Sequence, residues 1–242
     1  MTQRGVLYIA WETDDAVQAA LLDRAVASLR TVHPDVPFHI ARLPGIARHI
    51  EKASLRALTP FDVTAYLDAD TVVLGRLDFA FDMAERYGLA CCHDANPWRR
   101  RYVGMEGDAV EYDTGVLFFG AGASMLFEIW SRLAPVLDAR FAFVEGGQPK
   151  QAPRDDRLAF GRAVEQSGIV PLILHHNWNL RPRWQPSFFG PVKIWHDRAD
   201  VPDAVHDICR YYEDPAAIIQ FHFLGEPGHG PASITPSRLT GA

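Results

Sequence analysis

Two carboxylates, Asp68 and Asp70, follow an apolar run at residues 63–67 and are separated by one residue. The run is rich in β-branched and aromatic side chains, which favours a buried strand. Alternate side chains of a strand point the same way, so a continuing strand would place both carboxylates together. Adjacent carboxylates repel one another, and a hard divalent cation that prefers oxygen ligands would resolve the conflict. The spacing predicts a metal site here; the alternative is a strand end with two solvated acids.

The elements that must position these acids alternate between strand and helix patterns along the chain. Strands are expected at residues 6–11, 38–41, 63–67, 89–92, 114–119 and 191–195, and helices after Thr13 or Asp14, at 46–58, after Asp78, at 123–137 and near Asp155. This order predicts an α/β protein with helices on both faces of a mostly parallel sheet. Ligands of such sheets bind outside the carboxyl ends of the strands, where Asp68 and Asp70 would lie.

Length and composition fit one α/β domain that spans residues 1–242. The net charge of −6 argues against a nucleic-acid partner. No apolar run reaches the roughly 18 residues that a membrane span requires. The first residues contain no leader-type segment, and the three cysteines lack zinc-like spacing. We therefore expect a cytoplasmic protein with reduced thiols.

The blocks at residues 52–61 and 65–74 resemble the donor-site region of glycogenin-like glycosyltransferases. Lys52 lies 16 positions before Asp68, the distance at which that family carries a basic residue. The resemblance implies a GT-A type, Rossmann-like three-layer α/β/α fold and transfer of a hexose from a nucleotide sugar with retention of configuration. It also implies Mn²⁺ or Mg²⁺ as cofactor and a UDP-sugar as the favoured donor. The acceptor, whether glycan, lipid, protein or small molecule, stays open.

Further motifs follow in the family's order. Residues 112–119 are similar to the family's Asn-Ser-Gly or Asn-Thr-Gly strand, with Asp113 where Asn is usual. Residues 154–160 resemble its Asp-Gln helix start, which implies that Asp155 binds hydroxyls of the transferred sugar and that Asp156 lies near the reacting carbon. The donor contacts that the resemblance implies are Ala10, Trp11, Lys52, Asp68, Ala69, Asp70 and Asp113.

A third metal ligand could come from either of two histidines. His222 begins a His-Phe-x-Gly sequence like that of the family, but Asp214-Pro215 and Gly225 are helix start and stop signals. A helix across that segment would make His222 a packing residue. His196 ends the apolar run at residues 191–195 and follows the Trp178-Asn179 loop closely, as the family order requires. We favour His196.

Three further classes of protein remain open at this point. Asp68-Ala69-Asp70-Thr71-Val72 also fits haloacid-dehalogenase-type phosphatases, in which Asp68 would be the nucleophile and Asp70 the acid. The second class is a metal-dependent nucleotidyltransferase, and the third is a non-catalytic sugar-binding module. The basic, aromatic stretch at 96–104 and the connection at 146–153 could cover the donor or recognise the acceptor, because long loops on rigid scaffolds often carry function.

Overall fold

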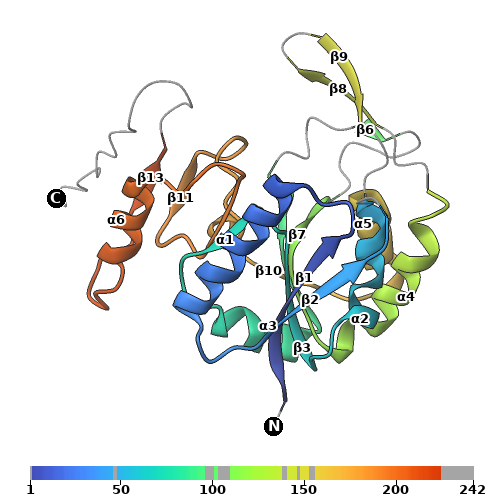
Figure 1. Ribbon diagram of the computed structural model, residues 1–242, viewed down its shortest axis with the longest axis horizontal. Coiled ribbons are helices and arrows are strands. Elements are labelled where there is room, and N and C mark those ends of the chain that lie inside the picture. The colour runs from blue at the N-terminus through green and yellow to red at the C-terminus, as the bar shows by residue number, and fades with distance from the viewer. Residues whose placement is uncertain are drawn as a thin grey trace.

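A six-stranded sheet forms the centre of the computed structural model (Figure 1). The structure describes residues 2–45, 48–95, 101–102, 110–137, 141–145, 148–152 and 156–224. In order across the sheet, the strands are β10 (Leu172–Ile173), β5 (Leu89–His93), β7 (Tyr112–Phe119), β3 (Val63–Leu67), β1 (Arg4–Trp11) and β2 (Phe38–Leu43).

The sheet is mostly parallel, as the sequence predicts. β1 runs parallel to β2 and β3, and β10 runs parallel to β5. β7 is antiparallel to both of its neighbours, β3 and β5. The middle of β7 is buried on both faces, which explains the continuous apolar run at residues 116–119.

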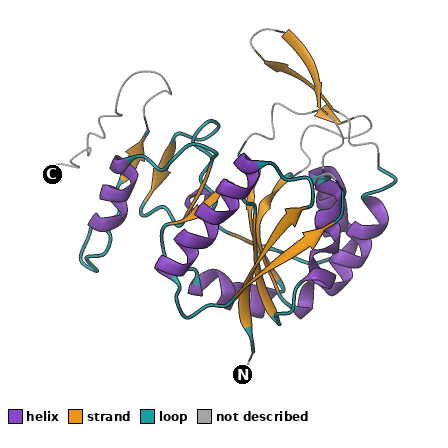
Figure 2. Ribbon diagram, in the orientation of Figure 1, coloured by secondary structure: helices purple, strands orange, loops and turns teal. Residues whose placement is uncertain are grey.

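Helices cover both faces of the sheet (Figure 2). On one face α1 (Ala16–Val32) and α3 (Asp78–Tyr87) pack through residues such as Ala25, Leu29 and Phe81. On the other face α2 (Leu55–Leu58), α4 (Ser124–Leu133) and α5 (Arg157–Ser167) pack around Trp130 and Phe160. This is the three-layer α/β/α arrangement that the resemblance implied.

Several helix boundaries differ from the sequence-based expectation. α1 is capped by Asp15, whose side chain accepts a hydrogen bond from the Gln18 N–H, and not by Thr13 or Asp14. The segment expected to be helical up to Leu58 is a 3₁₀ helix, η1 (His49–Ser54), followed by the single turn of α2. α4 ends at Leu133, before Pro135, because proline cannot donate the hydrogen bond that would continue the helix.

The C-terminal third adds two short antiparallel ladders and a small core of its own. β4 (Thr71–Val73) pairs with β12 (Ile194–His196), and β11 (Ser187–Phe189) pairs with β13 (Phe221–Phe223). The helix that the signals at Asp214-Pro215 and Gly225 would allow does not form across residues 214–224, because His222 lies in a strand. The core of this part consists of Val72, Leu180, Phe188, Val192, Trp195, Val205, Ile208 and Leu224.

The remaining elements lie at the periphery. α6 (Asp203–Tyr211) packs on the small core, and η4 (His176–Trp178) precedes β11. A three-stranded sheet of β6 (Arg101–Tyr102), β8 (Phe141–Glu145) and β9 (Gln148–Ala152) projects from the main body in Figure 1. Residues 96–100, 103–104, 146–147 and 153, in the two predicted cover loops, lie outside the described residues.

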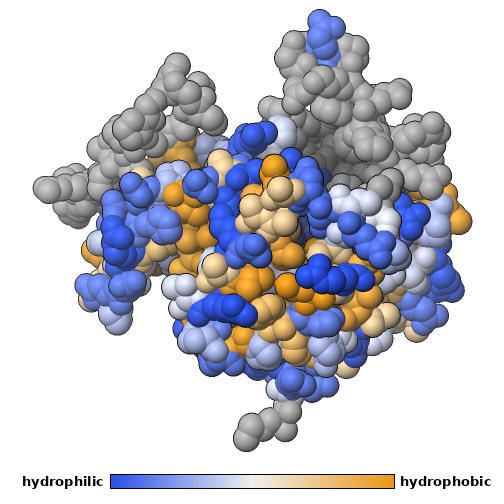
Figure 3. Space-filling view, viewed as in Figure 1, coloured by the Kyte–Doolittle hydropathy of each residue, from blue (hydrophilic) through white to orange (hydrophobic). Residues whose placement is uncertain are grey.

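The face of the molecule in Figure 3 is mixed in polarity. Hydrophilic residues cover α6, and hydrophobic residues reach the surface near the middle of the view, where α1 and β2 lie in Figure 1. Among the helices that the structure describes, none combines the length and the apolar character needed to span a membrane.

Candidate functional site

Asp68 and Asp70 lie in a tight turn between β3 and β4. β3 ends at Leu67, and the N–H of Asp68 donates to the carbonyl of Gly115 on β7 at 2.8 Å. Thr71 closes the turn through its N–H and its hydroxyl, which both donate to the Asp68 carbonyl at 3.2 and 2.8 Å. The two carboxylates are therefore brought together by a turn, and the expectation that a continuing strand would align them is wrong.

Asp68 is held from the protein side by two donors. The Lys52 ammonium lies 2.8 Å from Oδ1 and 2.9 Å from Oδ2, and the Tyr66 hydroxyl donates to Oδ1 at 2.6 Å. Lys52 is only 8% exposed. Burial opposes its charge, but the carboxylates of Asp68 and Asp156 outweigh burial and hold the pKa of Lys52 above its usual value. Lys52 therefore stays charged and compensates Asp68.

His196 completes a group of three possible metal ligands. Its Nε2 lies 3.0 Å from Oδ1 of Asp70 and 3.8 Å from Oδ2 of Asp68. One ligand atom from each of the three residues lies within 4.8 Å of the others. The ladder between β12 and β4 accounts for this placement, because its register sets His196 opposite Thr71, directly after Asp70.

The ring of His196 is fixed from behind by Asn179. Its Nδ1 lies 2.7 Å from Oδ1 of Asn179, and because an amide oxygen only accepts, Nδ1 carries the proton. Nε2 of a neutral ring is then a lone pair that faces Oδ1 of Asp70, which is also an acceptor. A cation between these two acceptors satisfies both, and an orienting hydrogen bond on the far nitrogen is typical of metal-binding histidines. The three side chains therefore fit a divalent ion.

Gly115 on β7 creates the space in which these side chains meet. A Cβ at this position would lie 2.4 Å from Cε1 of His196, 2.6 Å from Oδ2 of Asp68 and 3.0 Å from Nη2 of Arg181. Real Cβ atoms do not approach so closely, so any larger residue would displace the group. This is the physical reason for the glycine in the strand that resembles the family's Asn-Thr-Gly motif.

Asp113 lies behind the group of possible ligands and is 1% exposed. Its carboxylate faces Arg181, with Oδ2 2.6 Å from Nε and Oδ1 3.2 Å from Nη2, and it accepts from the Gly115 N–H at 2.8 Å. Burial would raise its pKa, but Arg181 outweighs burial and holds the pKa well below the usual value. The structure thus joins Asp113 to Arg181, a residue that the sequence had not marked.

The other residues that the sequence assigned to the site lie in several different places. Asp156 occupies the N-cap position of α5 without a side-chain capping hydrogen bond; it is buried, and the Thr114 hydroxyl donates to its Oδ2 at 2.6 Å. Asp155 lies outside the described residues. Ala10 is buried in the core, whereas Trp11 and Ala69 line a pocket. His222 is buried against Phe188 and belongs to no group of three possible metal ligands among the described residues.

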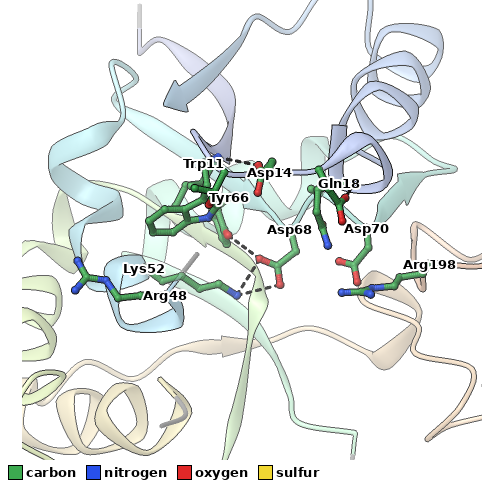
Figure 4. A pocket seen from close by; sticks show the side chains of 13 residues that line it. Trp11, Asp14, Gln18, Arg48, Lys52, Tyr66, Asp68, Asp70 and Arg198 are labelled. Atoms are coloured by element: carbon green, nitrogen blue, oxygen red, sulfur yellow. Dashed lines mark hydrogen bonds and ion pairs between the residues drawn. The ribbon is translucent and has the colours of Figure 1, made fainter. Parts of the chain in front are cut away.

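Two pockets flank Asp70. The first pocket has a volume of about 410 Å³ and lies between β1, the start of α1 and the turn that carries the acids (Figure 4). The second pocket, of about 180 Å³, adjoins His196, Arg181 and Trp184. Asp70 and Arg198 line both pockets. The sequence did not assign Asp14, Gln18, Arg48 or Arg198 to the site. They line the first pocket because the tertiary fold brings them together there.

Comparison with known proteins identifies the fold. No protein-family model and no curated protein matches the chain. Among solved structures, mouse xyloside xylosyltransferase 1 in its apo form is similar over 83% of this chain and 100% of that chain, at 11% identity and a TM-score of 0.53. A glycosyltransferase involved in glycosylation of the major capsid of PBCV-1 is similar over 86% and 99%, at 11% identity and a TM-score of 0.52.

A third similar structure is the glycosyltransferase GlyE of Streptococcus pneumoniae TIGR4, at 15% identity and a TM-score of 0.49. The match covers 75% of this chain, which spans only 47% of GlyE. At such identities structural similarity establishes the fold alone. The chain has the GT-A fold of these glycosyltransferases, and its Asp68, Asp70 and His196 are compatible with a metal site of the Asp-x-Asp type.

Proposed function

We propose that this protein is a metal-dependent glycosyltransferase that moves a hexose from a nucleotide-diphosphate sugar to an acceptor with retention of configuration. UDP is the nucleotide that we favour. The observation that carries the proposal is the meeting of Asp68, Asp70 and His196 beside the first pocket, on a fold shared with glycosyltransferases. We infer the transfer of a hexose, the UDP donor and the retention of configuration from the resemblance of residues 52–74 to the glycogenin-like family.

Two carboxylates beside an imidazole form a reasonable ligand set for Mn²⁺, with Mg²⁺ as the alternative, and Asp68, Asp70 and His196 would hold the ion. The bound ion would stabilise, as a Lewis acid, the negative charge that develops on the departing diphosphate. The protein's own task is to keep the three ligands in place. Lys52 and Tyr66 fix Asp68, and Asn179 fixes His196.

The first pocket is proposed to hold the nucleoside. Its volume of about 410 Å³ lies in the range of ligand sites, roughly 300 to 1,000 Å³. The Trp11 indole lies on its wall, and aromatic side chains provide stacking surfaces for bases (Figure 4). The backbone N–H of Trp11 donates a hydrogen bond to Oδ2 of Asp14 at 2.7 Å, which fixes the turn at the end of β1. Base and indole would therefore meet on a preformed wall.

The sugar end of the donor is proposed to lie toward β7 and the start of α5. Asp156 is held there by Thr114, and its charge acts on Lys52 across the site. We propose that Asp155 binds hydroxyls of the transferred hexose and that Asp156 lies near its reacting carbon, so that the anomeric carbon is oriented toward the acceptor. Holding the two reacting groups in this way is an orientation effect, which can supply a large part of the rate enhancement.

The phosphatase alternative is not favoured by the geometry. As a nucleophile, Asp68 would need a free carboxylate oxygen, but Lys52 and Tyr66 bind both of its oxygens from the protein side. As a general acid, Asp70 would need a raised pKa. Burial would raise it, but the contact with His196 and the charge of Arg181 outweigh burial and hold the pKa of Asp70 below its usual value. Asp70 is therefore ionised, as a metal ligand must be.

A donor screen tests the proposal. The protein is incubated with UDP-glucose, UDP-galactose and other nucleotide sugars in the presence of Mn²⁺, and slow hydrolysis is measured beside a panel of phosphomonoesters. Asp70→Asn should abolish Mn²⁺-dependent UDP binding and leave the thermal unfolding curve unchanged. Asp207→Asn, the same change at an exposed position on α6, is the control. Full turnover by Asp70→Asn, or by the native protein in excess chelator, would remove the claim.

A further inference from the structure

Among the described residues, Arg198 is the cation of the first pocket that lacks a partner. Three described cations line this pocket, of which Arg48 pairs with Glu51 and Lys52 pairs with Asp68. Within the ranges that the structure describes, the guanidinium of Arg198 makes neither a hydrogen bond nor an ion pair. Figure 4 shows it on the same side of the pocket as Asp70, away from Arg48. Its charge is therefore available to a ligand.

The backbone that carries Arg198 is held firmly by an arginine from another element. Arg24 of α1 donates from Nη2 to the carbonyl of Asp197 at 2.7 Å, and from Nη1 to the carbonyls of Arg198 and Ala199 at 3.1 Å each. It also pairs with the carboxylate of Asp200 at 3.1 Å. A surface turn fixed by one guanidinium through three successive carbonyls presents its side chains from a defined position.

The free charge lies at the junction of the two pockets, because Arg198 lines both. We expect the partner of Arg198 to be an anion that lies beside Asp70 at this junction. Lys52 cannot fill this need fully, because Asp68 already neutralises its ammonium. An arginine guanidinium presents a planar fork of N–H donors that matches phosphate oxygens. The geometry points to Arg198 as the side chain that binds a phosphate of the nucleotide diphosphate, an inference that rests on the proposed function.

Calorimetric titration of the full chain with UDP and with uridine, both in saturating Mn²⁺, tests this role. Arg198→Ala should weaken UDP binding about tenfold and leave uridine binding unchanged, because the lost contact is to phosphate. Arg198→Lys keeps the charge but not the fork, and it should recover part of the loss. Arg183→Ala is the matched control: it removes the same charge from the second pocket, where Arg183 faces Asp197, and should change UDP affinity less than about twofold.

Arg24→Ala tests the positioning separately. It keeps Arg198 but frees its backbone, so UDP affinity should fall by less than in Arg198→Ala while uridine binding stays the same. Equal UDP affinity of the native protein and Arg198→Ala would overturn the inference and leave the proposed function standing. An equal loss of uridine and UDP binding would also overturn it. Failure of the native protein to bind UDP with Mn²⁺ would instead refute the proposed function.

Discussion

Two short ladders in the C-terminal third each carry a buried histidine in different surroundings. His196 in β12 is 2% exposed and His222 in β13 is 5% exposed. The Nδ1 of His196 donates to Asn179 and its Nε2 faces Asp70. The Nε2 of His222 lies 2.8 Å from the Tyr212 hydroxyl, and the ring packs on Phe188. Burial alone therefore does not distinguish a ligand from a packing residue.

The partner strand makes the difference. β12 pairs with β4, which begins at Thr71 immediately after the acidic turn, so His196 comes to lie beside Asp70. β13 pairs with β11, Ser187–Phe189, which carries no acid. A histidine becomes a possible ligand here because of the strand opposite it and the acceptor behind it.

Replacing each histidine with alanine should give the largest contrast in Mn²⁺-dependent UDP affinity. His196→Ala should weaken Mn²⁺-dependent UDP binding at least tenfold, the usual scale for losing a ligand or its support. His222→Ala should leave that affinity nearly unchanged, although it should lower the denaturation midpoint because a packed ring is lost. The measurement is UDP titration with and without Mn²⁺. If His222→Ala loses the affinity and His196→Ala keeps it, the assignment is wrong.

Gly115→Ala sharpens the comparison without removing any ligand. Its new Cβ would press on His196 and Asp68, whose positions are fixed by Asn179 and Lys52. We expect Mn²⁺-dependent UDP affinity to fall severalfold and stability to fall by about 1–3 kcal/mol, as in other overpacked sites.

Gly120→Ala is the control for this change. It lies just beyond the other end of β7, where a Cβ would be 3.3 Å from the nearest atom, the Ala84 carbonyl oxygen. Its UDP affinity should equal that of the native protein. An unchanged affinity in Gly115→Ala would show that the glycine does not shape the site.

The sequence predicted the sheet because the strand signals are local. The β-branched runs of β1, β3 and β7 and the periodic apolar positions of α1 describe burial that does not depend on distant partners. The resemblance of residues 52–74 further indicated where a donor site would lie, and the structure has the GT-A fold that it implied.

Features created by tertiary pairing could not be predicted in this way. Asp113 and Arg181, which form an ion pair, are 68 residues apart in the sequence. Arg24 lies more than 170 residues before the carbonyls of residues 197–199 to which it donates. The helix expected around His222 failed for a related reason. Asp214-Pro215 does form a turn, but the pairing of β13 with β11 provides the backbone hydrogen bonds that a helix would otherwise make.

The smallest expected effect in the comparison of the two histidines is the pH dependence of stability that His222 contributes. Burial lowers the pKa of His222 below its usual value, so the unfolded chain takes up a proton at a higher pH than the folded one. This contribution to stability is complete above the unfolded pKa of about 6.5 and is lost as pH falls below it. His222→Gln removes the titration, so its denaturation midpoint should fall less than that of the native protein between about pH 7.5 and pH 5.5. His33 and His176, whose pKa values burial also lowers, remain in both proteins and act equally. Identical losses in the two proteins would mean that His222 takes up its proton equally in the folded and unfolded chains, and that its burial carries no electrostatic cost.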